Sequence, residues 1–239
     1  MVESNLIALD VISAGAAQAA LTHIASKFER ETGTVINAGF GAVGAMKARV
    51  TAHEPADVIV LTAALIDELA RDGYVVPGSR CDLGRVGTGV AVRAGTQRPD
   101  VRDLRVLRAN MLAATRIVCP DPQVATAGKV VMAALDKLGI TAQVKKRLKF
   151  FPNGKAAMAW LAHSSGALEM GITQVTEIMA DQGVTYVGPL PAELQSITTY
   201  SAGLSARARH PERAKEFIRR LTGFNAQAVL SAAGFDVGR

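Results

Sequence analysis

The sequence has few aromatic residues, only two cysteines and no paired histidines. Aromatic residues make up 5% of the 239 residues, which leaves few flat side chains on which nucleic-acid bases could stack. Cys81 and Cys119 lie in different segments with no Cys-x-x-Cys spacing, so neither a metal knuckle nor a disulfide framework is indicated. We expect two buried thiols, no metal site, no cofactor and no nucleic-acid partner.

Apolar runs and charge restrict the function classes further. No apolar stretch is long enough to span a bilayer, and no basic start is followed by an apolar export segment. We therefore expect no membrane insertion and no signal peptide in this sequence, which leaves a mature exported protein or a cytoplasmic one. The net charge of +6 is compatible with a small anionic ligand, whereas the densest basic run, residues 145–149, is typical of a solvated surface.

Strands and helices alternate along the chain. Short apolar runs lead into turns of small residues, and each turn opens a helical pattern. The first three turns begin at Ser13, Gly39 and Thr62, and parallel strands of this kind place their ligands outside the carboxyl ends, so these turns are expected at one crevice. The predicted strands cover 6–12, 35–38, 58–61, 116–119, 167–172 and 184–187, and the predicted helices cover 16–30, 43–52, 129–138, 155–163 and 174–179, with a last helix from Pro211.

Two extended segments divide the alternating pattern. A Val- and Gly-rich stretch at 84–93 and a second stretch at 197–204 predict strands that cross between two lobes and form a hinge. The sequence thus predicts a two-lobed α/β fold in which each lobe is a mainly parallel sheet flanked by helices. Lobe 1 is expected to comprise residues 1–88 and 200–239, and lobe 2 residues 89–199, with a ligand cleft between them.

Four short motifs stand at or beside the predicted turns. They are Ser13-Ala14-Gly15-Ala16, Gly39-Phe40-Gly41-Ala42-Val43-Gly44, Pro55-Ala56-Asp57-Val58-Ile59-Val60 and Gly166-Ala167-Leu168-Glu169-Met170-Gly171-Ile172. In this order they resemble the molybdate-binding type of periplasmic binding protein over nearly the whole chain. The resemblance implies a tetrahedral oxyanion held by serine hydroxyls, backbone amides and a tyrosine hydroxyl, a periplasmic location, and a permease of an ABC transporter as partner.

The sequence departs from that family at the implied ligand residues. Ala16 stands where the family has a serine, residues 42–44 replace a serine-rich stretch, and Gln174 occupies the tyrosine position. Each charge-assisted hydrogen bond to a buried anion is worth roughly 1.5–3 kcal/mol, so losing several argues against tight binding of molybdate or tungstate. Backbone amides at helix starts remain, and they favour a carboxylate.

Sixteen residues at the turns are the predicted ligand-binding set, and several have a structural alternative. Ser13 and Thr62 are also typical helix caps, Asn153 before a glycine is typical of a turn, and Tyr200 is equally suited to packing beneath the hinge. The set comprises Ser13, Ala14, Gly15, Ala16, Phe40, Gly41, Ala42, Val43, Thr62, Thr126, Ala127, Gly128, Lys129, Asn153, Gln174 and Tyr200.

The sequence favours a monomeric solute-binding protein that captures a small organic anion. An isomerase of an unsaturated tricarboxylate is the alternative, because the segment Gly188-Pro189-Leu190-Pro191 is similar to a branch of the fold that includes aconitate isomerase. Such an enzyme needs an acid and a base, and Lys47, Asp57, Lys129 and Glu169 offer no diagnostic constellation, so the catalytic residues stay unassigned. A cytoplasmic ligand sensor is a third reading.

Overall fold

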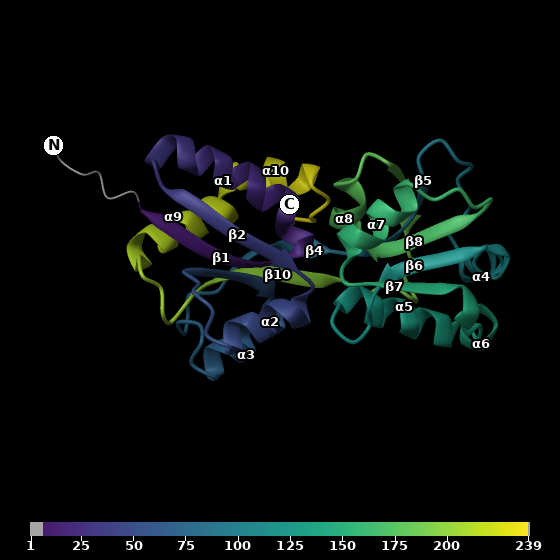
Figure 1. Ribbon diagram of the computed structural model, residues 1–239, viewed down its shortest axis with the longest axis horizontal. Coiled ribbons are helices and arrows are strands. Elements are labelled where there is room, and N and C mark those ends of the chain that lie inside the picture. The colour runs from purple at the N-terminus through teal and green to yellow at the C-terminus, as the bar shows by residue number, and fades with distance from the viewer. Residues whose placement is uncertain (1–6, 239) are drawn as a thin grey trace. The chain divides into compact units, whose positions relative to one another are not determined.

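The computed structural model describes residues 7–238, which form two compact α/β units (Figure 1). Unit 1 consists of the described residues up to Arg85 together with those from Thr199 onward, and unit 2 is Val86–Thr198. Each unit contains a five-stranded sheet. The start of the predicted first strand, Leu6, lies outside the described residues.

Unit 1 is built on the strand order β2-β1-β3-β10-β4. Strand β1 pairs in parallel with β2 and β3, whereas β10 runs antiparallel to β3. Its elements are β1 (Ala8–Ala14), η1 (Gly15–Ala17), α1 (Gln18–Thr32), β2 (Val35–Gly41), α2 (Val43–Thr51), β3 (Val58–Thr62), α3 (Ala63–Arg71), β4 (Cys81–Val86), β10 (Thr198–Leu204), α9 (Pro211–Thr222), η3 (Phe224–Ala226) and α10 (Gln227–Ala232).

Helices cover both faces of the sheet in unit 1. Helices α1, α9 and α10 lie on one face, and α2 and α3 lie on the other (Figure 1). Residues 58–61 of β3 are fully buried, which confirms the sequence prediction of a strand covered on both sides. On the α1 face, Phe28 and Phe217 pack with their ring centroids 5.1 Å apart. Apolar packing on both faces thus stabilises this sheet. Because β1, β2 and β3 are parallel, their carboxyl ends lie at the same edge of it.

Unit 2 is built on the strand order β7-β6-β8-β5-β9. Strand β6 pairs in parallel with β7 and β8, and β5 pairs antiparallel with β8 and β9, so the sheet is mixed. Its elements are β5 (Thr88–Arg93), α4 (Leu104–Ala113), β6 (Arg116–Pro120), α5 (Thr126–Lys137), α6 (Thr141–Val144), η2 (Lys145–Arg147), β7 (Leu148–Phe151), α7 (Gly154–Ala162), β8 (Glu169–Gln174), α8 (Val175–Met179) and β9 (Val184–Pro189).

The strands of unit 2 are buried on both faces because their side chains alternate between two apolar clusters. Ile117 and Cys119 join a cluster that includes residues of α4, α5 and α6. Val118, between them, joins a second cluster with residues of α7 and α8. This period of two is the ordinary geometry of a strand. It also explains why the predicted strands of this unit are nearly continuous apolar runs.

Several predicted turns belong to regular elements. Phe40 and Gly41 lie inside β2, residues 126–128 form the first turn of α5, and the predicted loop at Gly188-Pro189 is the end of β9. The prediction of turns at these positions was wrong. The residues have a turn-like composition, but their backbone groups form the hydrogen bonds of a strand or a helix. The first lobe's strands were correctly predicted to be parallel, but β10 enters the sheet antiparallel.

The cysteines differ from one another. Cys119 is buried in unit 2, and burial, with the nearby charge of Asp121, raises the pKa of its thiol to about 12. Cys81 is only half-buried, so the expectation of two buried thiols is wrong for this residue. Within residues 7–238 no helix is long and apolar enough to cross a membrane, and no group of three or more His, Cys, Asp or Glu side chains could hold a metal ion.

Candidate functional site

The carboxyl edge of the sheet in unit 1 offers mainly backbone amides. Ala14 at the end of β1 lies opposite Gly41 at the end of β2, and Ser13 lies opposite Val60 of β3, so the three strand ends are neighbours. Helix α2 begins after Ala42, whose side chain provides no cap. The first N–H groups of such a helix have no acceptor within it, and the helix dipole favours an anion there.

The hydroxyl groups at this edge have partners in their own turns. Ser13 Oγ donates to the carbonyl oxygen of Ala14 at 3.1 Å, and Thr62 Oγ1 accepts from the backbone N–H of Leu65 at 3.4 Å. Tyr200 lies opposite Thr62 in β10 and is 2% exposed, with its ring edge-on to Phe235. The structure therefore places Tyr200 in the core of unit 1, in line with its packing alternative.

The predicted Thr126–Lys129 turn of unit 2 is the start of α5, which also lacks a side-chain cap. Gly128 packs so closely on the preceding loop that an added Cβ would lie 2.4 Å from the carbonyl oxygen of Pro120. Lys129 is exposed and Thr126 is half-buried. Close packing explains why residue 128 is a glycine. Lys129 is on the exposed side of this segment.

Asn153 caps helix α7. Its Oδ1 accepts from the backbone N–H of Ala156 at 2.8 Å, which is the usual bond of an N-cap residue. Asn153 is thus a helix cap and not the turn residue considered as its structural alternative, and its oxygen is engaged within unit 2.

Gln174 lies in a group of buried polar side chains without partners. It is the last residue of β8, is 2% exposed, and faces Thr88 directly across the antiparallel β5–β8 pair. Side chains of directly opposed residues lie on the same face of a sheet, close together. Among the described residues, Gln174 Oε1 and Nε2, Thr88 Oγ1 and, two positions along, Thr176 Oγ1 are buried without a hydrogen-bond partner. We call the opposed pair Thr88 and Gln174, together with Thr176 two residues further along the chain, the polar cluster of unit 2.

Three unpaired atoms on two directly opposed residues, Gln174 and Thr88, are unusual, because a buried polar group without a partner costs about 1–3 kcal/mol. The two other unpaired buried side-chain atoms in the described residues are Thr34 Oγ1, in unit 1, and Arg93 Nε, at the other end of β5 from Thr88. The amide of Gln174 can donate and accept, and so can both hydroxyls. The polar cluster is therefore suited to a ligand that carries hydrogen-bonding oxygens.

Glu177 lies next to the polar cluster in α8 and is 9% exposed. Its Oε2 accepts from Thr173 Oγ1 at 2.5 Å, and the backbone N–H groups of Gly154 and Gln174 also donate to its carboxyl group. Burial raises the pKa of this carboxyl group above its usual value of 4.5, while the three hydrogen bonds act in the opposite direction. A buried carboxyl group thus lies three residues along the chain from Gln174.

Three of the four acid–base candidates from the sequence have partners within their own unit. Lys47 Nζ binds Glu68 at 2.7 Å, and Glu169 accepts from the backbone N–H of Gly166 at 2.9 Å. The carboxylate of Asp57, 1% exposed, accepts backbone N–H bonds from Asp10, Arg209 and His210. Asp57 thus has a structural role, because it ties the starts of β3 and α9 to β1.

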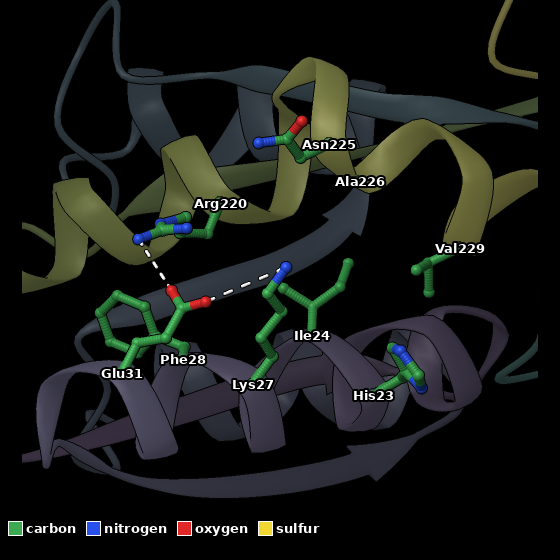
Figure 2. A pocket seen from close by; sticks show the side chains of 9 residues that line it. All are labelled: His23, Ile24, Lys27, Phe28, Glu31, Arg220, Asn225, Ala226 and Val229. Atoms are coloured by element: carbon green, nitrogen blue, oxygen red, sulfur yellow. Dashed lines mark ion pairs between the residues drawn. The ribbon is translucent and has the colours of Figure 1, made fainter.

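Unit 1 also has a surface pocket away from every predicted site residue. Figure 2 shows it between α1 and the segment from α9 to α10, with Glu31 bridging Lys27 and Arg220. Glu31 lies 2.9 Å from Arg220 and 3.9 Å from Lys27. The residues that line this pocket are His23, Ile24, Lys27, Phe28, Glu31, Arg220, Asn225, Ala226 and Val229. Exposed ion pairs of this kind contribute little, and they do not build a binding site.

Sequence reasoning missed Thr88, which the structure places opposite Gln174, and also Thr176 and Glu177, which follow Gln174 in α8. A signal was present, because residues 173–177 read Thr-Gln-Val-Thr-Glu directly after a buried strand. Polar residues at such a strand end are more often functional than those in the middle of a helix face. Thr88, in contrast, is inconspicuous in a stretch of valine and glycine.

Two units, each with a mixed sheet and with helix starts at the carboxyl edge of its parallel strands, define a class of α/β ligand-binding proteins. The chain belongs to the bacterial extracellular solute-binding protein family, whose model matches residues 9–236. This confirms the resemblance inferred from the turn motifs.

Relatives and solved structures agree with this family. The chain is 25% identical to an aconitate isomerase from Pseudomonas sp. over 233 residues, 95% of this chain and 86% of the relative. It is 26% identical to the molybdate-binding protein ModA of Azotobacter vinelandii over 220 residues, 91% of this chain and 85% of the relative. The solved periplasmic molybdate-binding protein of Azotobacter vinelandii superposes with a TM-score of 0.80 at 22% identity, covering 97% of this chain and all of that chain. The predicted fold class is therefore confirmed.

Proposed function

We propose that this solute-binding protein captures a small organic anion, and that a carboxylate is its preferred charged group. The polar cluster of unit 2 is the observation that carries the proposal, since Thr88, Gln174 and Thr176 keep four buried atoms without partners. A ligand oxygen or hydroxyl that pairs with these atoms removes a cost of about 1–3 kcal/mol for each of them. Ligand binding would thus supply the hydrogen-bond partners that these atoms lack in the ligand-free protein, and this gain would contribute to the free energy of binding.

Residues at the carboxyl edge of the sheet in unit 1 argue against molybdate as the ligand. ModA of Azotobacter vinelandii is a molybdate-binding protein by name, whereas here Ala16 and Ala42 carry no hydroxyl group. Ser13 and Thr62 direct theirs to the backbone of their own turns. A tetrahedral dianion needs many donors, but a carboxylate is served by the few amides at an uncapped helix start such as that of α2.

The family match also bears on the cellular setting. We propose that the protein acts in the periplasm as a monomer and delivers its ligand to the permease of an ABC transporter. The match to an extracellular solute-binding family supports this setting.

The leading proposal can be tested by a thermal-shift screen followed by calorimetry on the purified chain. Citrate, trans-aconitate, malate and acetate would be compared with molybdate, tungstate and sulfate. We expect at least one carboxylate to raise the melting temperature by mass action and the oxyanions to have little effect. The variant Gln174→Ala should bind that carboxylate at least about tenfold more weakly. Gln143→Ala, at an exposed glutamine of the same unit, is the control. Strong stabilisation by molybdate alone would refute the proposal.

A second function is supported by one observation, the similarity to an aconitate isomerase over 95% of this chain. Such an enzyme moves a double bond by proton transfer and needs a base within reach of the substrate. Incubating the protein with cis-aconitate and following trans-aconitate by chromatography tests this function. Turnover would establish an enzyme, and stoichiometric binding without turnover would exclude it.

A further inference from the structure

Gln174 does not exchange backbone hydrogen bonds with Thr88, the residue that it faces. Gln195 binds both backbone groups of Thr88: its Oε1 accepts the N–H at 2.8 Å, and its Nε2 donates to the carbonyl oxygen at 2.9 Å. Thr88 and Gln174 are therefore a non-hydrogen-bonded pair of the antiparallel ladder, in which the two side chains approach each other more closely. The backbone N–H of Gln174 consequently needs an acceptor outside the β5–β8 pair.

Glu177 provides this acceptor. Gln174 is the N-cap residue of α8, Glu177 is the third residue of this helix, and the backbone N–H of Gln174 donates to the Glu177 carboxyl group. This bond is one half of a capping box. In the other half, the side chain of the N-cap residue would accept a backbone N–H of the first turn, but the Gln174 side chain makes no such bond and is unpaired among the described residues. Glu177 thus satisfies the backbone of Gln174, while the side-chain amide keeps its hydrogen-bonding capacity.

The Glu177 carboxyl group is itself held in place by two other elements. Thr173 Oγ1, near the end of β8, donates to it at 2.5 Å, and the backbone N–H of Gly154, the first residue of α7, donates as well. An added Cβ at residue 154 would lie 1.9 Å from Glu177 Oε2, so this approach requires a glycine. The buried carboxyl group therefore joins the start of α7 to the end of β8 and the start of α8.

We propose that Glu177 is a positioning residue for ligand binding, which fixes the backbone of Gln174 so that its side-chain amide is available to a ligand oxygen and is not used to cap α8. Glu177 acts through Gln174 and needs no contact with the ligand. The inference rests on the proposed role of Gln174 in binding a small organic anion. Its physical basis is preorganisation: an amide on a fixed backbone loses less conformational freedom on binding, and it has no protein partner to give up.

The test compares Glu177→Gln, which keeps an acceptor for backbone N–H groups, with Glu177→Met, which has a similar length and no such acceptor. Citrate, trans-aconitate and malate would be titrated into the full chain by calorimetry, with circular dichroism to verify that each variant is folded. We expect the Gln variant to stay within about twofold of the wild-type affinity and the Met variant to bind at least about fivefold more weakly. Wild-type affinity in the folded Met variant would overturn the proposal.

The double variant Glu177→Met/Gln174→Ala separates positioning from a general structural role. If Glu177 acts through the amide of Gln174, its replacement has no further effect once that amide is removed, so the double variant should bind within about twofold of Gln174→Ala. An equal loss from Glu177→Met in both backgrounds would contradict the proposal. Glu169→Met is the matched control, because Glu169 also accepts a backbone N–H in unit 2, that of Gly166 at 2.9 Å, and it should bind like the wild type.

The side-chain N–H signals of Gln174 provide a measurement that needs no ligand. In a proton–nitrogen correlation spectrum, Glu177→Gln and Glu169→Met should retain the wild-type signals of Gln174 Nε2, and Glu177→Met should shift or broaden them. Unchanged signals in the folded Met variant would show that Glu177 does not position this amide. If none of the three carboxylates binds the wild type, the proposed function fails, whereas these signals still decide the role of Glu177, so the two failures are distinguishable.

Discussion

Buried polar groups have different surroundings in the two units. In unit 1, the Asp57 carboxylate accepts three backbone N–H bonds, and Ser201 Oγ donates to Asp82 at 2.6 Å. In unit 2, Thr88, Gln174 and Thr176 keep unpaired atoms although they are equally buried. Thr34 is the exception in unit 1, with one unpaired hydroxyl. Paired groups stabilise a fold, whereas a cluster of unpaired ones lowers stability and is expected where a ligand completes the bonding.

The largest expected effect is at Asp57 in unit 1. Asp57→Ala leaves three backbone N–H groups without their acceptor, one in β1 and two just before α9, and we expect a loss of about 3–5 kcal/mol in the free energy of unfolding. Urea denaturation would measure it. Asp103→Ala is the control, since Asp103 is an exposed cap of α4 with one bond to Val106 N–H, and it should cost only about 1 kcal/mol. Equal losses in the two variants would contradict the comparison.

Gly154→Ala should have the next largest effect, in unit 2. Its Cβ would meet Glu177 Oε2 and Thr173 Oγ1 far inside contact distance, so we expect a loss of about 2–4 kcal/mol. Lys155→Ala changes the exposed next residue and should stay within about 0.5 kcal/mol of the wild type. In the double variant with Glu177→Ala, the losses should not add, because the colliding carboxyl group is gone. Additive losses would show that the two residues do not interact.

Two buried or partly buried glutamines of unit 2 differ in whether their side-chain amides have hydrogen-bond partners. Gln174→Leu removes two buried atoms without partners, and we expect it to raise the free energy of unfolding of the ligand-free protein by about 1 kcal/mol. Gln195 binds the backbone of Thr88 with both amide atoms, at 2.8 and 2.9 Å. Gln195→Leu should therefore destabilise the protein by about 2 kcal/mol. A loss at Gln174 as large as that at Gln195 would mean that Gln174 is a structural residue.

The smallest expected effect is a pH dependence that arises from Glu177. Because its pKa is raised in the folded protein, the folded state retains this proton at pH values where the unfolded chain has lost it. Its contribution to stability is complete below about pH 4.5 and is lost as pH rises through the folded pKa. The free energy of unfolding of Glu177→Gln should therefore rise relative to that of the wild type between pH 4 and pH 8. Parallel pH profiles of the two proteins would contradict the raised pKa.

Local patterns in the sequence predicted the elements of this fold well. The apolar run at 58–61 is a fully buried strand, and Pro211 is the first residue of α9, as its fixed φ favours. Composition was less reliable at strand ends. Phe40 and Gly41 have the composition of a turn but continue β2, because pairing with β1 satisfies their backbone.

The candidate site was only partly accessible from the sequence. Gln174 was identified through its place in a family pattern, and the structure adds that its amide has no partner among the described residues. Tyr200 was a ligand candidate, and the structure places it in the core beside Phe235. Which face of a strand a residue occupies depends on neighbours that are distant in the sequence.

The sequence by itself determined the order of strands and helices, the family and the shortage of hydroxyl groups where a molybdate site would need them. These properties follow from local periodicity and from residue identity. Only the tertiary structure decided that Thr88 lies opposite Gln174 and that Glu177 reaches Gly154. Both contacts depend on strand pairing and helix packing, which bring together residues whose chemistry is unremarkable until their distances and their missing partners are known.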